Sequence, residues 1–337
     1  MTRLRADAAL LTAALLWGGA FVAQRVAEGV VPPLGFVAAR FAISALMLAP
    51  LAAFETRRAA ARFDARTWRL AIVISLTLFV GSVLQQIGLA TTTVSNGGFL
   101  TACYVVLVPI AVWLLTGRLP RSIVAVACLL STAGAWLLAS GGGAARPMSV
   151  GDGLILLSDV AWALGIALTP MFLARQPRPF TLAFLEYAIC GAFAAGAATA
   201  FEPMRAADFV AGLVPLLYAG VISGGVAFTT QIVAQGYTPP AEAALILSLE
   251  SVFAAVAGAI LLAERLTAIA TAGCALILFS VLMVELGAPL LARLSGGAVH
   301  GPAPAPPGSP SAEPRARVAA ALCSAPETSM SAPKPTG

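Results

Sequence analysis

The amino-acid sequence predicts an all-α polytopic membrane protein, in which ten transmembrane helices form two inverted five-helix repeats. Three observations predict this fold class: an apolar composition, ten long apolar runs, and the similarity of one half of the chain to the other. Of the 337 residues, 59% are hydrophobic and 10% are charged, and the mean hydropathy is +0.92. Charged residues make up roughly 25% of a soluble domain, so this composition excludes an ordinary soluble fold.

Ten apolar runs are long enough to cross a membrane, because a helix of about 20 apolar residues spans about 30 Å of hydrocarbon. Their connections are short and leave no room for a soluble catalytic domain. The runs lie at residues 8–27, 34–54, 69–90, 96–116, 121–140, 152–173, 180–200, 209–233, 241–262 and 267–288.

The ten runs divide into two groups of five. We expect residues 1–140 to form the first repeat and residues 151–288 the second, with an external linker at 141–150. Residues 289–337 are rich in proline, alanine, serine and glycine, a composition that cannot bury a core. We therefore expect this last segment to be a disordered cytoplasmic tail.

Internal similarity indicates that one half-protein was used twice. Residues 81–118 contain a glutamine-bearing apolar helix, a polar turn and a second apolar run, and a weaker copy returns at residues 228–265, 147 positions later. Trp17 and Trp162 lie at a similar offset of 145, each inside the apolar run that opens its half. Self-similarity at a fixed offset is typical of repeat architectures.

The arginines predict the orientation. If the N-terminus is cytoplasmic, most arginines fall on the inner side, as the positive-inside rule requires. We therefore expect an integral protein of the bacterial inner (plasma) membrane with both termini in the cytoplasm. Because each half has five helices, the second half must then be inserted upside down. The inner arginines are Arg3, Arg5, Arg57, Arg58, Arg62, Arg66, Arg69, Arg118, Arg121, Arg175, Arg178 and Arg293.

Composition and motifs also predict several absences. The pI of about 9.3 reflects this arginine bias, so we expect no nucleic-acid partner. The five cysteines are scattered singly, without the C-x-x-C spacing of a metal site. A Walker A motif is missing as well, which argues against ATP coupling. We expect neither a metal nor a cofactor.

The first two helices carry four candidate site residues. Trp17, Phe21 and Gln24 are spaced four and three apart, so they share one face of the first helix. That face either packs as an aromatic stripe or walls a central cavity. In the second helix, Arg40 lies about two turns inside the outer end. A charge at this depth usually faces a partner or water, although snorkelling to the outer surface is the alternative.

Helices three to five combine a polar end with an apolar scaffold. Helix three ends in Gln85-Gln86, which point about 100° apart, so at most one of the two faces a cavity. Pro109 removes one backbone hydrogen bond and predicts a kink in helix four. Helix five carries a ridge of small residues suited to close packing. We expect helices five and ten to form the scaffold or the contact of a homodimer.

Helices six to eight supply further polar residues. Asp159 and Trp162 lie three apart on one face of helix six, and Asp159 shares the predicted depth of Arg40, which permits an ion pair. Glu186 lies about two turns from the inner end of helix seven. Gln231 of helix eight belongs to the same inner layer and follows a cluster of glycines.

Helix nine places Glu250 near the middle of the membrane, where no basic residue is predicted. An unpaired buried carboxylate holds its proton to avoid the cost of desolvation. Glu250 is therefore a candidate proton carrier. The alternative is a structural acid that is protonated or bonded to an amide.

Several motifs resemble the drug/metabolite transporter superfamily, specifically its EamA type with two tandem five-helix repeats. The resemblance covers about residues 8–288. It departs from the family at Ser251, where a proline usually follows the glutamate, and at Gly117, where the second repeat has Glu264. We expect the first departure to straighten helix nine. The motifs are Leu16-Trp17-Gly18, Arg40-Phe41, Gln85-Gln86-Ile87-Gly88-Leu89, Gln235-Gly236-Tyr237-Thr238, Leu249-Glu250-Ser251-Val252-Phe253 and Glu264-Arg265-Leu266-Thr267.

The resemblance implies a ten-helix secondary carrier, often an exporter of amino acids, other metabolites or drugs, with a central cavity lined by all helices except five and ten. We expect alternating access around a small-molecule substrate, with protons or a cation and membrane lipids as further partners. The expected roles are stacking walls for Trp17 and Trp162, coupling for Glu250, an outer gate for Arg40 and Asp159, and an inner vestibule for Glu186 and Gln231.

Two other functions remain as alternatives. A flippase for a lipid-linked substrate would use the same architecture with a different cargo. An intramembrane enzyme is disfavoured, because the single histidine, His300, lies in the predicted tail and Asp159, Glu186 and Glu250 are predicted at three different depths. We therefore expect the protein not to be an enzyme.

Overall fold

The computed structural model describes residues 1–59, 62–92, 94–140, 149–261, 263 and 265–294. Within these residues the chain is helical and contains no strand. The predicted external linker lies almost entirely outside the described residues, as does most of the predicted tail. The statements below concern the described part.

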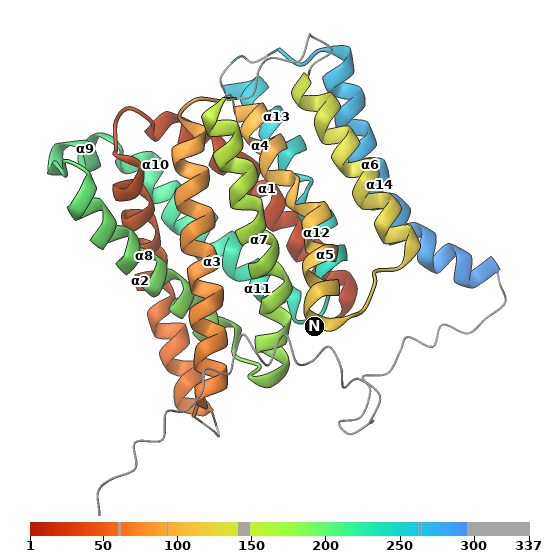
Figure 1. The fold of residues 1–337 in the computed structure, drawn as a ribbon, viewed down its shortest axis with the longest axis horizontal. Coiled ribbons are helices and arrows are strands. Elements are labelled where there is room, and N and C mark those ends of the chain that lie inside the picture. Colours follow the sequence, from red (N-terminus) through yellow and green to blue (C-terminus); the bar gives the residue numbers. More distant parts are fainter. Residues whose placement is uncertain (60–61, 93, 141–148, 262, 264, 295–337) are drawn as a thin grey trace, which may run out of the picture.

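Ten helical segments of the described chain are long and apolar enough to cross a membrane, which confirms the predicted number of spans. Some of these spans are built from two or three successive elements (Figure 1). The elements are α1 Arg3–Ala27, α2 Pro33–Arg58, α3 Ala65–Leu89, α4 Val94–Ala102, α5 Tyr104–Thr116, α6 Ser122–Ser140, α7 Val150–Arg175, α8 Pro179–Phe201, α9 Ala206–Ala211, α10 Leu213–Leu217, η1 Tyr218–Phe228, α11 Thr229–Gln235, α12 Pro240–Leu247, α13 Glu250–Leu261 and α14 Ala268–Leu294.

The two repeats are inverted, and the contact of α2 with α8 shows how they interlock. Glu202, which follows α8, accepts hydrogen bonds from the Leu34 and Gly35 N–H groups at the start of α2, both at 2.9 Å. Glu55 near the end of α2 accepts from the Thr181 N–H at 2.6 Å and the Thr181 hydroxyl at 2.7 Å, in the first turn of α8. The two glutamates are 147 positions apart, the offset of the sequence repeat. Each repeat therefore caps a helix start of the other.

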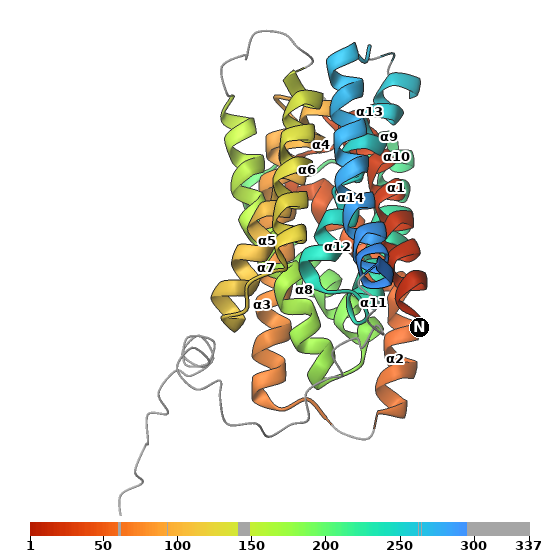
Figure 2. The same cartoon turned by 90° about the vertical axis from the view of Figure 1, so that its right-hand side faces the viewer.

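Helices α6 and α14 pair with each other at one side of the bundle (Figures 1 and 2). A Cβ on Gly134 of α6 would lie 2.8 Å from the carbonyl oxygen of Gly273 of α14, so the two backbones are in direct contact. The small residues of the α6 ridge are buried inside the chain. A homodimer through these helices stays a prediction and would have to use their outer faces, which expose Trp136 and Phe279.

Two large apolar clusters hold most of the described bundle together. One includes Leu10 of α1 and Leu245 of α12, and the other includes Phe172 of α7 and Leu182 of α8. Trp162 packs against both clusters and so lies at their boundary. In a bilayer such close packing replaces the hydrophobic effect as the force between helices.

The fourth and ninth spans are both broken near the middle of their length. Helix α4 ends before Cys103, whose N–H donates to the Leu100 carbonyl at 3.1 Å, a turn one residue tighter than an α-helix. In the second repeat the Leu249 N–H donates to the Ile246 carbonyl at 3.2 Å. These breaks are repeat-equivalent, and discontinuous helices of this kind form the binding sites of many transporters.

The breaks correct two expectations from the sequence. Helix α5 continues through Pro109, so the interruption lies before the proline and not at it. The ninth span is broken although Ser251 replaces the family's proline. The Ser251 hydroxyl donates to the Ser248 carbonyl at 2.7 Å, and such side-chain bonds to the backbone compete with the helical ladder.

The eighth span contains a π-helix, η1, whose carbonyl groups are held by three other helices. The Trp17 indole N–H of α1 donates to the Ser223 carbonyl at 3.2 Å, and the Tyr187 hydroxyl of α8 donates to the Gly224 carbonyl at 3.0 Å. The Ser44 hydroxyl of α2 lies 2.7 Å from the Gly220 carbonyl. Wide turns of this kind are rare and frequently mark functional sites.

Candidate functional site

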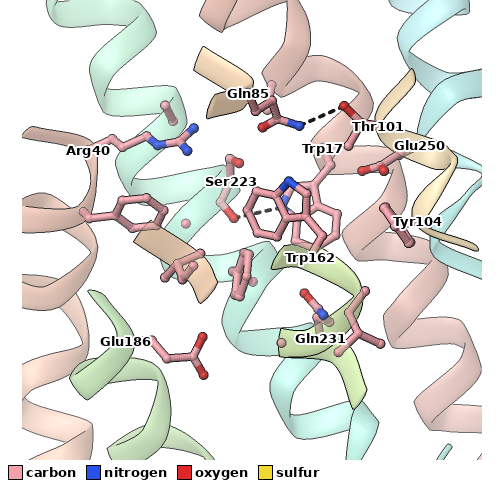
Figure 3. Close-up of a pocket in the computed structure, with 18 of the residues that line it drawn as sticks. Trp17, Arg40, Gln85, Thr101, Tyr104, Trp162, Glu186, Ser223, Gln231 and Glu250 are labelled. Carbon is pink, nitrogen blue, oxygen red and sulfur yellow. Dashed lines mark hydrogen bonds between the residues drawn. The ribbon is translucent and has the colours of Figure 1, made fainter. Parts of the chain in front are cut away.

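A cavity lies between the two repeats and encloses about 800 Å³ of empty space, counting the part that opens to solvent. Among the described residues, no lining side chain comes from α6 or α14, in line with what the resemblance implies. Figure 3 shows the polar and aromatic side chains of its wall. The lining includes Trp17, Phe21, Gln24, Arg40, Phe41, Gln85, Thr101, Tyr104, Trp162, Thr169, Glu186, Ser223, Phe228, Gln231 and Glu250.

The structure brings nine of the ten predicted site residues to this cavity and places Asp159 outside its lining. Gln85 lines the cavity and its neighbour Gln86 does not, which agrees with the 100° step between adjacent helical residues. The expected gate between Arg40 and Asp159 is not formed, since no described carboxylate lies within 4 Å of Arg40. Two residues at the same depth in the membrane can still point in different directions around their helices, so the predicted depth did not ensure that Arg40 and Asp159 meet.

Arg40 dominates the end of the cavity away from the N-terminus, here called the upper end (Figure 3). Its side chain is buried, and one Nη donates to the Gln24 amide oxygen at 3.2 Å. The guanidinium also lies over the ring of Phe41, 4.7 Å from its centroid. Its Nε has no hydrogen-bond partner among the described residues. A buried cation with a free donor is a ready-made contact for an anionic or carbonyl group of a ligand.

Aromatic rings form the centre of the cavity. Trp17 and Trp162 both pack against Phe228, with ring centroids 5.3 and 6.0 Å away. Gly81 of α3 makes room for Trp162, because a Cβ there would lie 3.1 Å from the indole. The Trp17 N–H is bonded to Ser223, whereas the Trp162 N–H has no partner within the described chain. The centre therefore offers apolar surface and one unused donor.

The lower end of the cavity carries polar groups from the second repeat (Figure 3). Glu186 of α8 and Gln231 of α11 are both buried, and each keeps one oxygen without a partner in the described structure. Glu186 and Arg40 stand at repeat-equivalent positions, 146 residues apart. Inversion thus places a basic and an acidic side chain at the two ends of one cavity.

Glu250 and Tyr104 begin the helical segments that follow the two breaks, and they lie side by side at the cavity wall (Figure 3). The Tyr104 hydroxyl and one Glu250 oxygen lack a hydrogen-bond partner in the described residues. Asp159, fully buried behind the wall, is close enough to interact electrostatically with both. The sequence predicted Asp159 and Glu250 at different depths, whereas the structure brings the two carboxyl groups, from α7 and α13, near enough to interact.

Polar contacts close both ends of the bundle. At the lower end, Arg3 forms an ion pair with Glu242, and the Thr238 hydroxyl donates to Asp7 at 2.8 Å. We call these four residues the lower latch. They join the start of α1 to the start of α12.

The opposite end holds an equivalent set. The Asn96 amide donates to Asp152 at 3.0 Å, and the Thr91 and Ser149 hydroxyls lie 3.3 Å apart. These four residues, the upper latch, join the starts of α4 and α7. The offsets from Asp7 to Asp152 and from Thr91 to Thr238 are those of the repeat, so the latches are counterparts, one ionic and one mainly neutral.

Comparison with known proteins matches both repeats separately. The model of the EamA-like transporter family matches residues 4–140 and again residues 149–286. The chain belongs to this family. It is therefore a transporter of the EamA type, within the drug/metabolite transporter superfamily, and an integral membrane protein.

Two further likenesses agree with this assignment. This EamA-like transporter is 31% identical over 288 residues to an uncharacterized transporter of Archaeoglobus fulgidus, with 84% of this chain and 87% of that protein covered. A solved crystal structure matches 86% of this chain and 99% of its own chain, with a TM-score of 0.68 and 20% identity. The second likeness concerns the fold alone.

Sequence reasoning missed several residues of the transporter's cavity. Phe228, on which both tryptophans pack, comes from the π-helix, and one apolar residue among many carries no signal in a sequence. Thr101 accepts a hydrogen bond from the Gln85 amide at 2.9 Å. Tyr104 gave a weak signal, as a tyrosine at the centre of an apolar run. A hydroxyl at that depth needs a polar neighbour.

Proposed function

We propose that this protein is a secondary active transporter that moves a small, partly polar metabolite, amino acid or drug by alternating access. The observation that carries the proposal is the cavity between inverted repeats, in which buried polar atoms of Arg40, Trp162 and Glu186 lack partners among the described residues. Buried polar groups are normally satisfied. Unused donors and acceptors in an apolar cavity are what a binding site presents to its ligand.

The wall of the cavity indicates the chemistry of the solute. An anionic or carbonyl group would meet Arg40, an apolar or aromatic body would lie against Trp17 and Trp162, and a donor group would meet Glu186. Because Arg40 and Glu186 come from opposite ends, a solute that satisfies both must bridge the repeats. The relative position of the two repeats would then depend on whether the solute occupies the cavity.

The two latches supply the gates of the cycle. Both latches are formed in this structure, and we assign them the roles of lower and upper gate. Breaking the Arg3–Glu242 pair would open the lower end, and breaking the Asn96–Asp152 contact would open the upper end. Rocking of one repeat against the other exchanges which latch is formed.

Glu250 is the proposed coupling residue, with a proton or a cation as its ligand. It lies at the cavity wall, at mid-membrane, next to a break in the helix, and the nearest ionisable neighbours among the described residues are Tyr104 and Asp159. A carboxyl without a basic partner changes its charge only by exchanging a proton or binding a cation. That change would alter the solvation of the cavity and so bias the cycle.

The arginine bias supports an orientation with the lower end in the cytoplasm, in a bacterial inner membrane. In that orientation the ionic latch faces the cytoplasm, and we propose export as the direction. The same family membership supports a transport role and no enzymatic one. Convergence of Asp159 and Glu250 does not favour a hydrolase, because Asp159 lies outside the cavity lining.

Counterflow in proteoliposomes tests the proposal. Vesicles preloaded with one candidate solute should accumulate the same labelled solute, and Glu250→Gln should change the rate. The matched control is Glu28→Gln, which removes a carboxylate outside the spans. Solutes that bind can be found by their effect on the intrinsic fluorescence of the protein. If none of these solutes shows counterflow, the transport proposal is overturned. An unchanged rate in Glu250→Gln would remove Glu250 from the mechanism.

A further inference from the structure

A second hollow lies at the lower end of the bundle, between the ends of α2 and α7 and the start of α8. It encloses about 1180 Å³ of empty space and opens to the surroundings. It shares no lining residue with the transport cavity. We call it the basic groove. Its function is therefore separate from the binding of the transported solute.

The charged lining of the basic groove is mostly cationic. Arg58 ends α2, Arg175 ends α7, and Arg178 immediately precedes α8, so three different elements bring their arginines to one place. Glu55 is the acid in the lining, and one of its oxygens already accepts two hydrogen bonds from Thr181. The balance of three guanidinium groups against one carboxylate favours a ligand with negative charge.

The groove continues from its basic end along an apolar strip of α2. Leu51, Phe54 and Arg58 follow one face of the helix at spacings of three and four. From Arg58 to Leu51 the strip runs about 10 Å toward the middle of the membrane. Leu51 is 46% exposed and Phe54 is 55% exposed, so both present open apolar surface. Arg58 lies over the Phe54 ring, 4.1 Å from its centroid, which joins the two parts of the groove.

We propose that the basic groove binds an anionic phospholipid of the membrane. Its phosphate would contact Arg58 and Arg175, and its glycerol and first acyl carbons would lie along Phe54 and Leu51. A soluble phosphate compound would use the arginines alone and leave the strip uncovered. Basic pockets between transmembrane helices are suited to acidic headgroups, and arginines near the surface are attracted to an anionic leaflet.

Thermal unfolding of the full-length protein in neutral detergent tests this assignment with three soluble probes. Dihexanoyl-phosphatidylglycerol carries both charge and acyl chains, dihexanoyl-phosphatidylcholine carries chains without net charge, and glycerol 3-phosphate carries charge without chains. Only the first should raise the Tm, by a few degrees at saturation. An equal rise with glycerol 3-phosphate would identify a site for soluble phosphates, and an equal rise with the choline lipid would exclude recognition of charge; either result overturns the proposal.

Matched variants locate the site. Arg58→Gln/Arg175→Gln should abolish the Tm shift, whereas Arg62→Gln/Arg66→Gln, which removes the same charge from the same end outside the groove, should keep it. Equal shifts in the two double variants would overturn the proposal. If the first double variant does not fold, native mass spectrometry of the wild type decides instead. The protein should retain phosphatidylglycerol in preference to phosphatidylcholine, and equal retention of the two lipids would contradict the proposal.

Discussion

Trp17 and Trp162 occupy equivalent positions in the two repeats, and their indole rings converge on one side chain, Phe228, at 5.3 and 6.0 Å. Their N–H groups are used differently. Trp17 is tied to the π-helix through Ser223, and the Trp162 N–H has no partner within the described chain. The repeat thus supplies two similar aromatic walls, one with its N–H bonded within the chain and the other with its N–H unused.

Replacing each tryptophan by phenylalanine should separate these roles. Trp162→Phe should raise the Kd of the solute found by counterflow about 3- to 10-fold, since a hydrogen bond contributes about 0.5–1.5 kcal/mol, with little change in Tm. Trp17→Phe should lower the Tm, because it removes the hydrogen bond that ties α1 to the Ser223 carbonyl of η1. Tryptophan-fluorescence titration and thermal unfolding measure the two effects. A Tm loss in Trp162→Phe alone would contradict the assignment.

Arg40→Met should impair transport and spare the fold. A buried charge without a carboxylate partner contributes little to stability, and a well-packed apolar replacement is often neutral or stabilising. Loss of a charged hydrogen bond to the solute, worth about 1.5–3 kcal/mol, should reduce counterflow at low solute concentration at least about tenfold. The exposed Arg66→Met variant serves as control. A large fall in the Tm of Arg40→Met with normal counterflow would show that Arg40 is structural.

Glu250→Gln should abolish the response of transport to an imposed pH gradient. The amide has the size of the carboxyl group, cannot exchange a proton at this pH range and carries no negative charge. Solute uptake into proteoliposomes is measured with and without the gradient. Glu28→Gln should respond like the wild type. A response that persists in Glu250→Gln would assign the coupling to another group.

A disulfide across one latch should stop the transport cycle with that end of the cavity closed, so the two latches should trap opposite states. In a background without native cysteines, Asp7→Cys/Thr238→Cys should lock the lower end and Asn96→Cys/Asp152→Cys the upper end. Each disulfide should block counterflow until a reductant is added. A cysteine at Ser223 should then react with an impermeant reagent only from the end that is still free to open. Unhindered counterflow through both cross-linked forms would refute the gating role.

Gly220→Ala should destabilise the protein by overpacking the contact between η1 and α2. Its Cβ would lie 2.9 Å from the Arg40 carbonyl oxygen, a backbone atom that cannot rotate away. We expect a loss of about 1–3 kcal/mol, seen as a lower Tm. Gly196→Ala is the control, because a Cβ there meets nothing within 4 Å and alanine is the better helix former. Equal Tm values would show that the contact is loose.

The sequence allowed the ten spans and their inverted order to be predicted, because apolar length and internal repetition are written along the chain. The breaks before Tyr104 and Glu250 could not be predicted, since they arise from tight turns and from serine hydroxyl groups that bond to nearby carbonyls. The π-helix was equally hidden. The glycines at 220 and 224 indicated close approach without showing that the turn widens.

The sequence allowed the depth of each site residue in the membrane to be predicted, but not the direction in which its side chain points. Rare polar residues in apolar helices gave nine lining positions, since burying them against lipid is costly. Asp159 has the same rarity and depth as Arg40, yet it points toward Glu250. Depth follows from counting residues, whereas direction depends on how each helix is rotated by its neighbours.

Six lining side chains keep a polar atom without a partner among the described residues: Arg40, Tyr104, Trp162, Glu186, Gln231 and Glu250. Such atoms require water when no solute is bound, and a hydrated region has a high dielectric constant, so the middle of the bundle holds little of the membrane voltage. The membrane voltage then falls mostly across whichever latch is shut. A unit charge crossing 100 mV changes free energy by about 2.3 kcal/mol, so the charged groups of the latches, Arg3 and Glu242 below and Asp152 above, lie where that voltage acts.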